Sequence, residues 1–97
     1  MNILDKKIEK LGFELEDFSY DENGNILNFT YRRHNDEFNY DQNVVILHKK
    51  SGKHILQSYD PNLMDKNNIG NINIGLSYEE MKLFTKKMKQ VIRKYWK

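Results

Sequence analysis

The chain of 97 residues contains no cysteine, no alanine and a single proline. Without cysteine it can form neither a disulfide scaffold nor a thiolate-ligated zinc or iron–sulfur site, and thiol catalysis is excluded as well. No apolar run approaches the roughly 20 residues of a membrane span, and the N-terminus lacks the basic-then-apolar pattern of a signal peptide. We therefore expect a soluble, cytoplasmic protein that carries no cofactor and contacts no membrane.

Lysine, asparagine, isoleucine and tyrosine are abundant in the chain, and their codons are rich in AT, whereas alanine and proline have GC-rich codons. The bias is typical of an AT-rich genome and indicates no function. Charged residues make up 31% of the chain and aromatic residues 12%, which is the composition of a polar but folded protein. The length predicts a single domain that spans residues 1–97.

The net charge of +2 is distributed unevenly along the chain. Residues 77–97 hold seven Lys or Arg and two Glu, a net charge of +5. Residues 1–76 hold nine basic and twelve acidic residues, a net charge of −3. A basic segment attached to an acidic body makes nucleic acid a candidate partner only through that segment.

Two helices are predicted, one at each end of the chain. Leu4, Ile8 and Leu11 form an apolar stripe on a short helix over residues 2–11, which Gly12 is placed to end. Residues 77–80 form a capping box at the start of a helix of about five turns. The predicted apolar face of this second helix excludes Leu83 and consists of Met81, Phe84, Met88, Val91, Ile92 and Tyr95.

Five short strands are predicted between the helices. The strands cover residues 13–20, 26–33, 44–50, 53–59 and 72–76, and the first has an irregularity at Asp17. The predicted connections include a turn at 21–25, a loop at 34–42 and a two-residue turn at Ser51–Gly52. The predicted fold is α+β: an antiparallel meander sheet of four to five strands, with the short N-terminal helix and the long C-terminal amphipathic helix packed on one face.

The candidate binding residues are basic and fall into two groups. A stripe on the back of the C-terminal helix places its cations within roughly 80° of one another and consists of Lys82, Lys86, Lys89, Arg93 and Lys97. The stripe is either a solvated helix back or a surface for phosphate or acidic groups. The second group is Tyr31, Arg32 and Arg33, but adjacent strand residues point to opposite faces, which favours a solvated strand end.

Histidine and carboxylate groups suggest no further site. With a two-residue turn, His48 and His54 fall on opposite faces of the sheet and share no metal, so no metal site is predicted. The acidic cluster of residues 14–22 lies on one strand and its turn, where exposure is expected, and the spacing of a calcium loop is missing. No catalytic motif is present, so we expect the chain not to be an enzyme.

From Val44 onward, the order of strand, hairpin, strand, loop, strand and capped helix resembles the four-strand-plus-helix unit of single-stranded-DNA-binding coactivators. The stretch INIGLSYEEMKLF carries most of this likeness. It covers about half of the chain and lies mostly in a generic strand-to-helix cap, and the N-terminal helix and hairpin depart from the pattern. The chain is therefore assigned to no family on this ground.

The leading hypothesis is a small non-enzymatic protein–protein interaction module. Its loops hold Phe38, Tyr40, Leu63 and Met64, residue types that are enriched in interface cores. Its size and codon bias are typical of inhibitors or regulators encoded by phages or mobile elements of AT-rich bacteria. The alternative is a nucleic-acid-binding protein that uses the basic face of the C-terminal helix. Pairing of an edge strand, residues 71–76, would give a homodimer.

Overall fold

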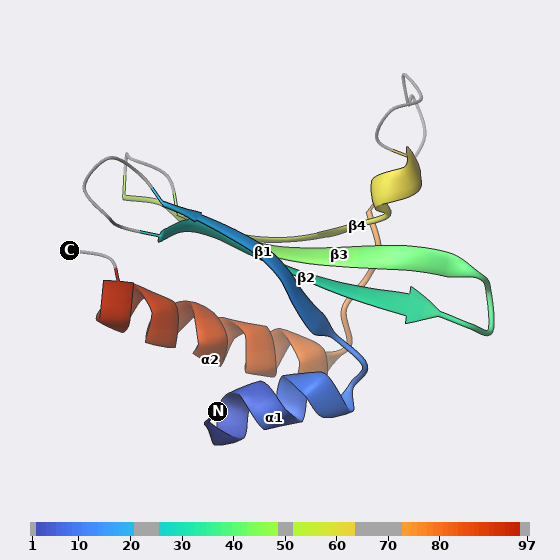
Figure 1. Cartoon of the computed structure of the whole chain (residues 1–97), viewed down its shortest axis with the longest axis horizontal. Helices are drawn as coiled ribbons and strands as arrows, with labels where there is room; N and C mark the ends of the chain where they lie inside the picture. Colours follow the sequence, from blue (N-terminus) through green and yellow to red (C-terminus); the bar gives the residue numbers. More distant parts are fainter. Residues whose placement is uncertain (1, 21–25, 49–51, 64–72, 96–97) are drawn as a thin grey trace.

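A computed structural model describes residues 2–20, 26–48, 52–63 and 73–95 of the chain. One antiparallel sheet has the strand order β1-β2-β3-β4, and two helices cover one of its faces (Figure 1). The elements are α1 Ile3–Lys10, β1 Glu14–Tyr20, β2 Ile26–Asn35, β3 Tyr40–His48, β4 His54–Tyr59, a 3-10 turn at Pro61–Leu63, and α2 Tyr78–Tyr95. The predicted α+β class and meander topology are confirmed. No described helix has the length and apolarity needed to cross a membrane.

Both helix caps follow from the sequence. The Asn2 side chain accepts from the backbone N–H of Asp5 at 2.8 Å and starts α1, and Gly12 follows α1 with φ of +94°. At the start of α2, the Ser77 N–H donates to a carboxylate oxygen of Glu80 at 2.8 Å, and the Glu80 N–H donates to the Ser77 hydroxyl at 3.0 Å. The predicted capping box is confirmed.

The core lies between the sheet and the helices. Alternate residues of β2 and β3 supply its sheet side, because side chains two apart share a face of a strand. Phe84 of α2 is fully buried and meets Phe13 edge to face at a centroid distance of 5.0 Å. The buried cluster comprises Ile8, Phe13, Phe29, Tyr31, Val44, Ile46, Leu83, Phe84 and Val91.

The buried face of α2 differs from the prediction. Leu83, which was expected outside the apolar face, is buried, whereas Met81 keeps 46% of its surface exposed. The reason is that α2 has two neighbours, since α1 packs along one side of it (Figure 1). The residues of α2 that are buried are therefore those that face either the sheet or α1, and Lys87 is among them.

The strand boundaries also differ from the prediction in two places. β2 and β3 continue to Asn35 and Tyr40, so the predicted loop at 34–42 shrinks to four residues, with Phe38 exposed at its tip. A fifth strand is not formed in the described residues: Asn73 makes an isolated antiparallel bridge to Tyr59. The predicted turn at 21–25 and residues 64–72 lie outside the described residues.

The predicted placement of the histidines is wrong. His48 and His54 are directly paired across β3 and β4, so the two side chains share the helix-covered face instead of lying on opposite faces. The connection between the strands is five residues long, not two, and this odd change in length shifts the register by one. The two Nδ1 atoms are 2.6 Å apart.

This histidine pair predicts a pH-dependent loss of stability. Burial, together with the charge of His54, lowers the pKa of His48. The unfolded chain therefore binds a proton at His48 near the ordinary value of 6.5, and the folded protein binds it only at lower pH. Stability is full above pH 6.5 and falls as the pH drops below it.

We expect the free energy of unfolding, measured with urea between pH 7.5 and 5.5, to decrease with falling pH. The slope approaches at most about 1.4 kcal/mol per pH unit, the limit for one proton. The His48→Gln variant should show a flatter dependence, because it has no imidazole to protonate on unfolding. An unchanged slope in that variant would contradict this assignment.

Candidate functional site

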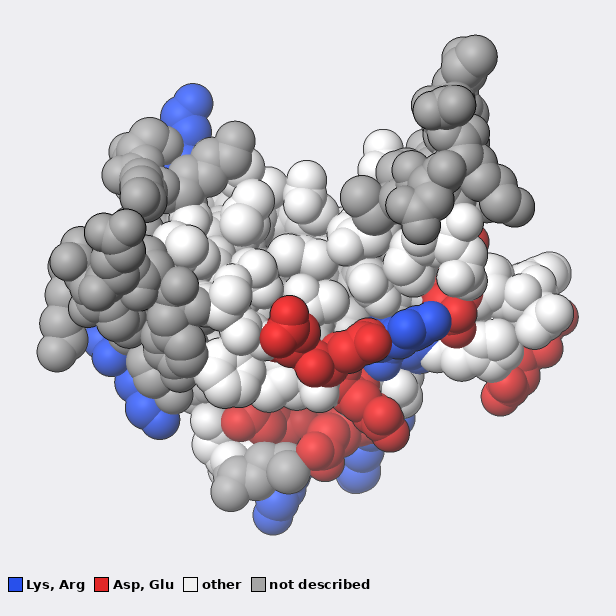
Figure 2. Space-filling view, turned by 45° about the horizontal axis from the view of Figure 1, so that its top comes forward, with Lys and Arg blue, Asp and Glu red and all other residues white. Residues whose placement is uncertain are grey.

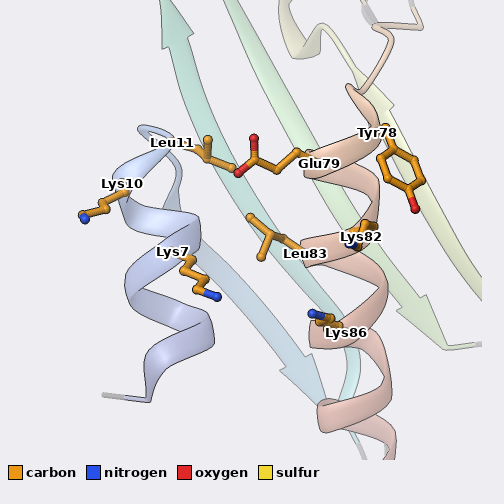
Figure 3. Close-up of a pocket in the computed structure, with 8 residues that line it drawn as sticks. All are labelled: Lys7, Lys10, Leu11, Tyr78, Glu79, Lys82, Leu83 and Lys86. Carbon is orange, nitrogen blue, oxygen red and sulfur yellow. The ribbon is translucent and has the colours of Figure 1, made fainter.

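A groove runs between the two helices on the side of the molecule away from the sheet (Figure 3). α1 and α2 are antiparallel, so the end of α1 lies beside the start of α2. The groove has a volume of about 500 Å³. It is lined by Lys7, Lys10, Leu11, Tyr78, Glu79, Lys82, Leu83 and Lys86.

The floor of this groove is apolar. Leu11 and Leu83 lie between the helices (Figure 3), and both belong to the core or pack against it. Tyr78 stands at the margin with 74% of its surface exposed. An open groove with an apolar floor and an exposed aromatic side chain at its margin can bind an apolar side chain of another molecule.

The rim of the groove is cationic. Four lysines line it, two from each helix, and Glu79 is the one carboxylate among the lining residues. Lys7 points across toward α2 (Figure 3). The Lys82 ammonium lies 5.4 Å from the centroid of the Tyr78 ring, within the range of a cation–π contact.

The structure brings part of the predicted basic stripe into this groove. Lys82 and Lys86 line it. Lys89 and Arg93 are exposed further along α2, and Lys97 lies outside the described residues. Sequence reasoning missed Lys7 and Lys10, because no pattern within α1 indicates that α2 will pack beside it.

The other predicted basic residues are not brought together. Tyr31 belongs to the core, and burial, with a smaller contribution from Asp5, raises the pKa of its hydroxyl well above the usual range. Arg32 and Arg33 point to opposite faces of the sheet, as alternation predicts. Each arginine is bound within the chain.

Arg33 occupies the junction of four elements. Its guanidinium forms an ion pair with Glu80 at 2.8 Å and donates to the side-chain oxygen of Gln42 at 2.8 Å and to the carbonyl of Leu11 at 3.2 Å. It also lies 4.1 Å from the centroid of the Phe13 ring. This arginine is a structural residue that joins α1, β2, β3 and α2.

Arg32 lies on the face of the sheet away from the helices. It donates to Asp41 at 2.8 Å and to Glu16 at 3.3 Å, and Asp41 also contacts His34 Nδ1 at 2.8 Å. Hydrogen bonds from His34, Arg32 and Asn62 hold the pKa of Asp41 well below its usual range. The charge of Arg32 is therefore neutralised within the chain by the carboxylates of Asp41 and Glu16.

Lys87 is the one α2 lysine that burial removes from the candidate surface. It is 8% exposed, forms an ion pair with Asp5 of α1 at 2.7 Å and donates to Gln90 at 2.9 Å. It holds the two helices together and is not among the residues that line the groove.

Histidine and acidic side chains of the described residues form no cluster of three or more that could hold a metal ion. Comparison with models of protein families, with curated protein sequences and with solved structures gives no match. The inter-helical groove is therefore interpreted from its own chemistry.

The Arg33 junction predicts a selective effect of neutralising Glu80. Burial alone would raise the pKa of Glu80, but the Ser77 amide and the Arg33 guanidinium outweigh it and lower the pKa. The carboxylate thus contributes stability above its ordinary pKa of 4.5, and this contribution is lost as the pH falls below that value.

We expect Glu80→Gln to lower the free energy of unfolding at pH 7 by about 1.5–3 kcal/mol, the range for hydrogen bonds to charged groups. The difference from the unmodified protein should shrink between pH 5 and pH 3 in urea titrations. The matched control is Glu79→Gln, an exposed neighbour, which should change stability by less than about 0.5 kcal/mol. Equal effects of the two variants would contradict the assigned role.

Proposed function

We propose that the protein is a non-enzymatic protein–protein interaction module that docks on its partner with the two-helix face. The observation that carries the proposal is the inter-helical groove, where an apolar floor opens to the surface between two fixed helices. Burial of apolar surface is the main driving force of protein association, and a preformed groove lowers the entropic cost of binding.

Exposed apolar side chains next to the groove support this proposal. Tyr78 lines the groove with 74% of its surface exposed, and Met81, outside the lining but on the same helix, keeps 46% of its surface exposed. Tyrosine and methionine are enriched in the cores of protein interfaces. An inhibitor or regulator encoded by a phage or mobile element of an AT-rich bacterium is the form of this function that size and composition favour.

The distribution of charged contacts also favours binding over turnover. The ion pairs of Arg33 with Glu80 and of Lys87 with Asp5 hold elements of the fold together.

Photo-crosslinking from the groove tests the proposal. With a photoreactive amino acid at position 78, a stoichiometric protein partner from a bacterial lysate should be captured at least tenfold more than with the same group at position 57. Gln57 is exposed on the other face of the sheet, which makes it the matched control. Absence of a partner, or equal capture from both positions, would contradict the proposal.

Nucleic-acid binding is the second candidate, and one observation favours it. Lys82, Lys86, Lys89 and Arg93 are exposed along α2, and lysines of α1 extend the same cationic surface. Lysine and arginine side chains that neutralise phosphates release counterions, which makes the affinity strongly dependent on salt.

If nucleic acid is the ligand, an electrophoretic shift with a 30-nucleotide single strand should weaken steeply with salt. Changing any one of the exposed residues Lys82, Lys86, Lys89 and Arg93 to glutamine should lower the slope of log affinity against log salt by about one. This candidate is excluded if the slope is unaffected by these changes. It is also excluded if the protein partner captured from the lysate by crosslinking is still captured after nuclease treatment.

A further inference from the structure

The four lysines of the groove belong to the exposed cations of the fold that no carboxylate of the described residues neutralises, as do Lys6, Lys53, Lys89 and Arg93. Within the described residues, Arg32, Arg33 and Lys87 each form an ion pair with a carboxylate of the chain. None of the four groove lysines forms such a pair in that part of the chain. The fold thus uses its carboxylates on cations that hold elements together and leaves a cationic rim around the groove.

The groove combines this rim with an apolar floor, and the two features specify different parts of a ligand. Leu11 and Leu83 offer contact to an apolar side chain. The ammonium groups on both helices offer partners to carboxylates that flank it. Electrostatic complementarity of this kind sets specificity and the rate of association, whereas the apolar contact supplies most of the affinity.

From this arrangement we propose that the inter-helical groove binds an acidic amphipathic segment of a partner protein, with an apolar side chain seated on Leu11 and Leu83 and carboxylates at the four lysines. The proposal rests on the proposed function and names the chemistry of the partner. Laying an apolar face into a groove between helices is a recurrent mode of peptide recognition.

The apolar floor favours this partner over nucleic acid, because a phosphate backbone has no apolar side chain to seat on Leu11 and Leu83. Figure 2 shows another face of the molecule, where acidic side chains gather around a basic one and most other basic side chains emerge at the lower margin. This acidic face is therefore not the surface that would receive an acidic ligand.

Fluorescence anisotropy with defined probes tests the proposal. The probe is a labelled 14-residue peptide that carries glutamates and, at helical spacing, leucines. The comparison probes are the same peptide with serine in place of each leucine, and a single-stranded 15-mer of thymidine. We expect the acidic amphipathic peptide to bind about tenfold or more tightly than either comparison probe.

Charge reversal on the protein should remove this binding. We expect Lys82→Glu combined with Lys86→Glu to weaken the peptide about tenfold or more, and to favour a peptide with lysine in place of each glutamate. The matched control combines Lys6→Glu with Lys53→Glu, two exposed residues outside the lining of the groove, and should bind as the unmodified protein does. The gain for the lysine peptide shows that the groove variant is folded.

Three outcomes would overturn the proposal: equal binding of the serine peptide, tighter binding of the thymidine strand, or self-association of the protein that the groove variant abolishes. If the crosslinked partner is captured through position 78 but still binds the groove variant, this inference fails while the proposed function stands. If no partner is captured, the proposed function itself fails.

Discussion

The ion pair between Arg33 and Glu80 is the contact on which the arrangement of the elements depends. Arg33 reaches the end of α1 through the Leu11 carbonyl, β3 through Gln42, and α2 through Glu80. Burying an ion pair costs desolvation energy that only a complete set of partners offsets. Arg33 has such a set, and Glu80 uses its other oxygen to cap α2, so the position of Arg33 fixes where that helix begins. Gly12 belongs to the same constraint, because a Cβ there would lie 3.3 Å from Cδ of Arg33.

A second ion pair fixes the helices at the opposite end. Lys87 reaches from α2 to Asp5 near the start of α1, while Arg33 holds the end of α1 beside the start of α2. Two polar ties with apolar residues such as Leu83 between them set the spacing of an antiparallel helix pair. The groove is the outer side of this helix pair, so contacts within the protein fix its shape before any ligand binds. A preformed groove limits the ordering cost of binding.

The sequence predicted the parts of the fold that depend on local patterns. The capping box of α2, the left-handed Gly12 and the alternation in β2 depend on neighbouring residues, and each was predicted correctly. The errors lie where a distant element decides. The predicted apolar face of α2 omits Leu83, because the sequence does not show that α1 packs beside this helix. The register of His48 and His54 depends on the length of the connection between β3 and β4, and a register shift of one residue moves a side chain to the other face.

The candidate site shows the same division between local and tertiary information. Charge periodicity placed Lys82 and Lys86 on one surface of α2, which is half of the cationic rim. Lys7 and Lys10 follow no comparable pattern, since their role arises only when α1 and α2 lie side by side. Net charge is a poor guide for the same reason, because it counts Lys87 and Arg33 together with the groove lysines. What a partner meets is the set of charges that the fold leaves without an internal carboxylate. Around an apolar floor, that set favours an acidic amphipathic segment over a uniform polyanion.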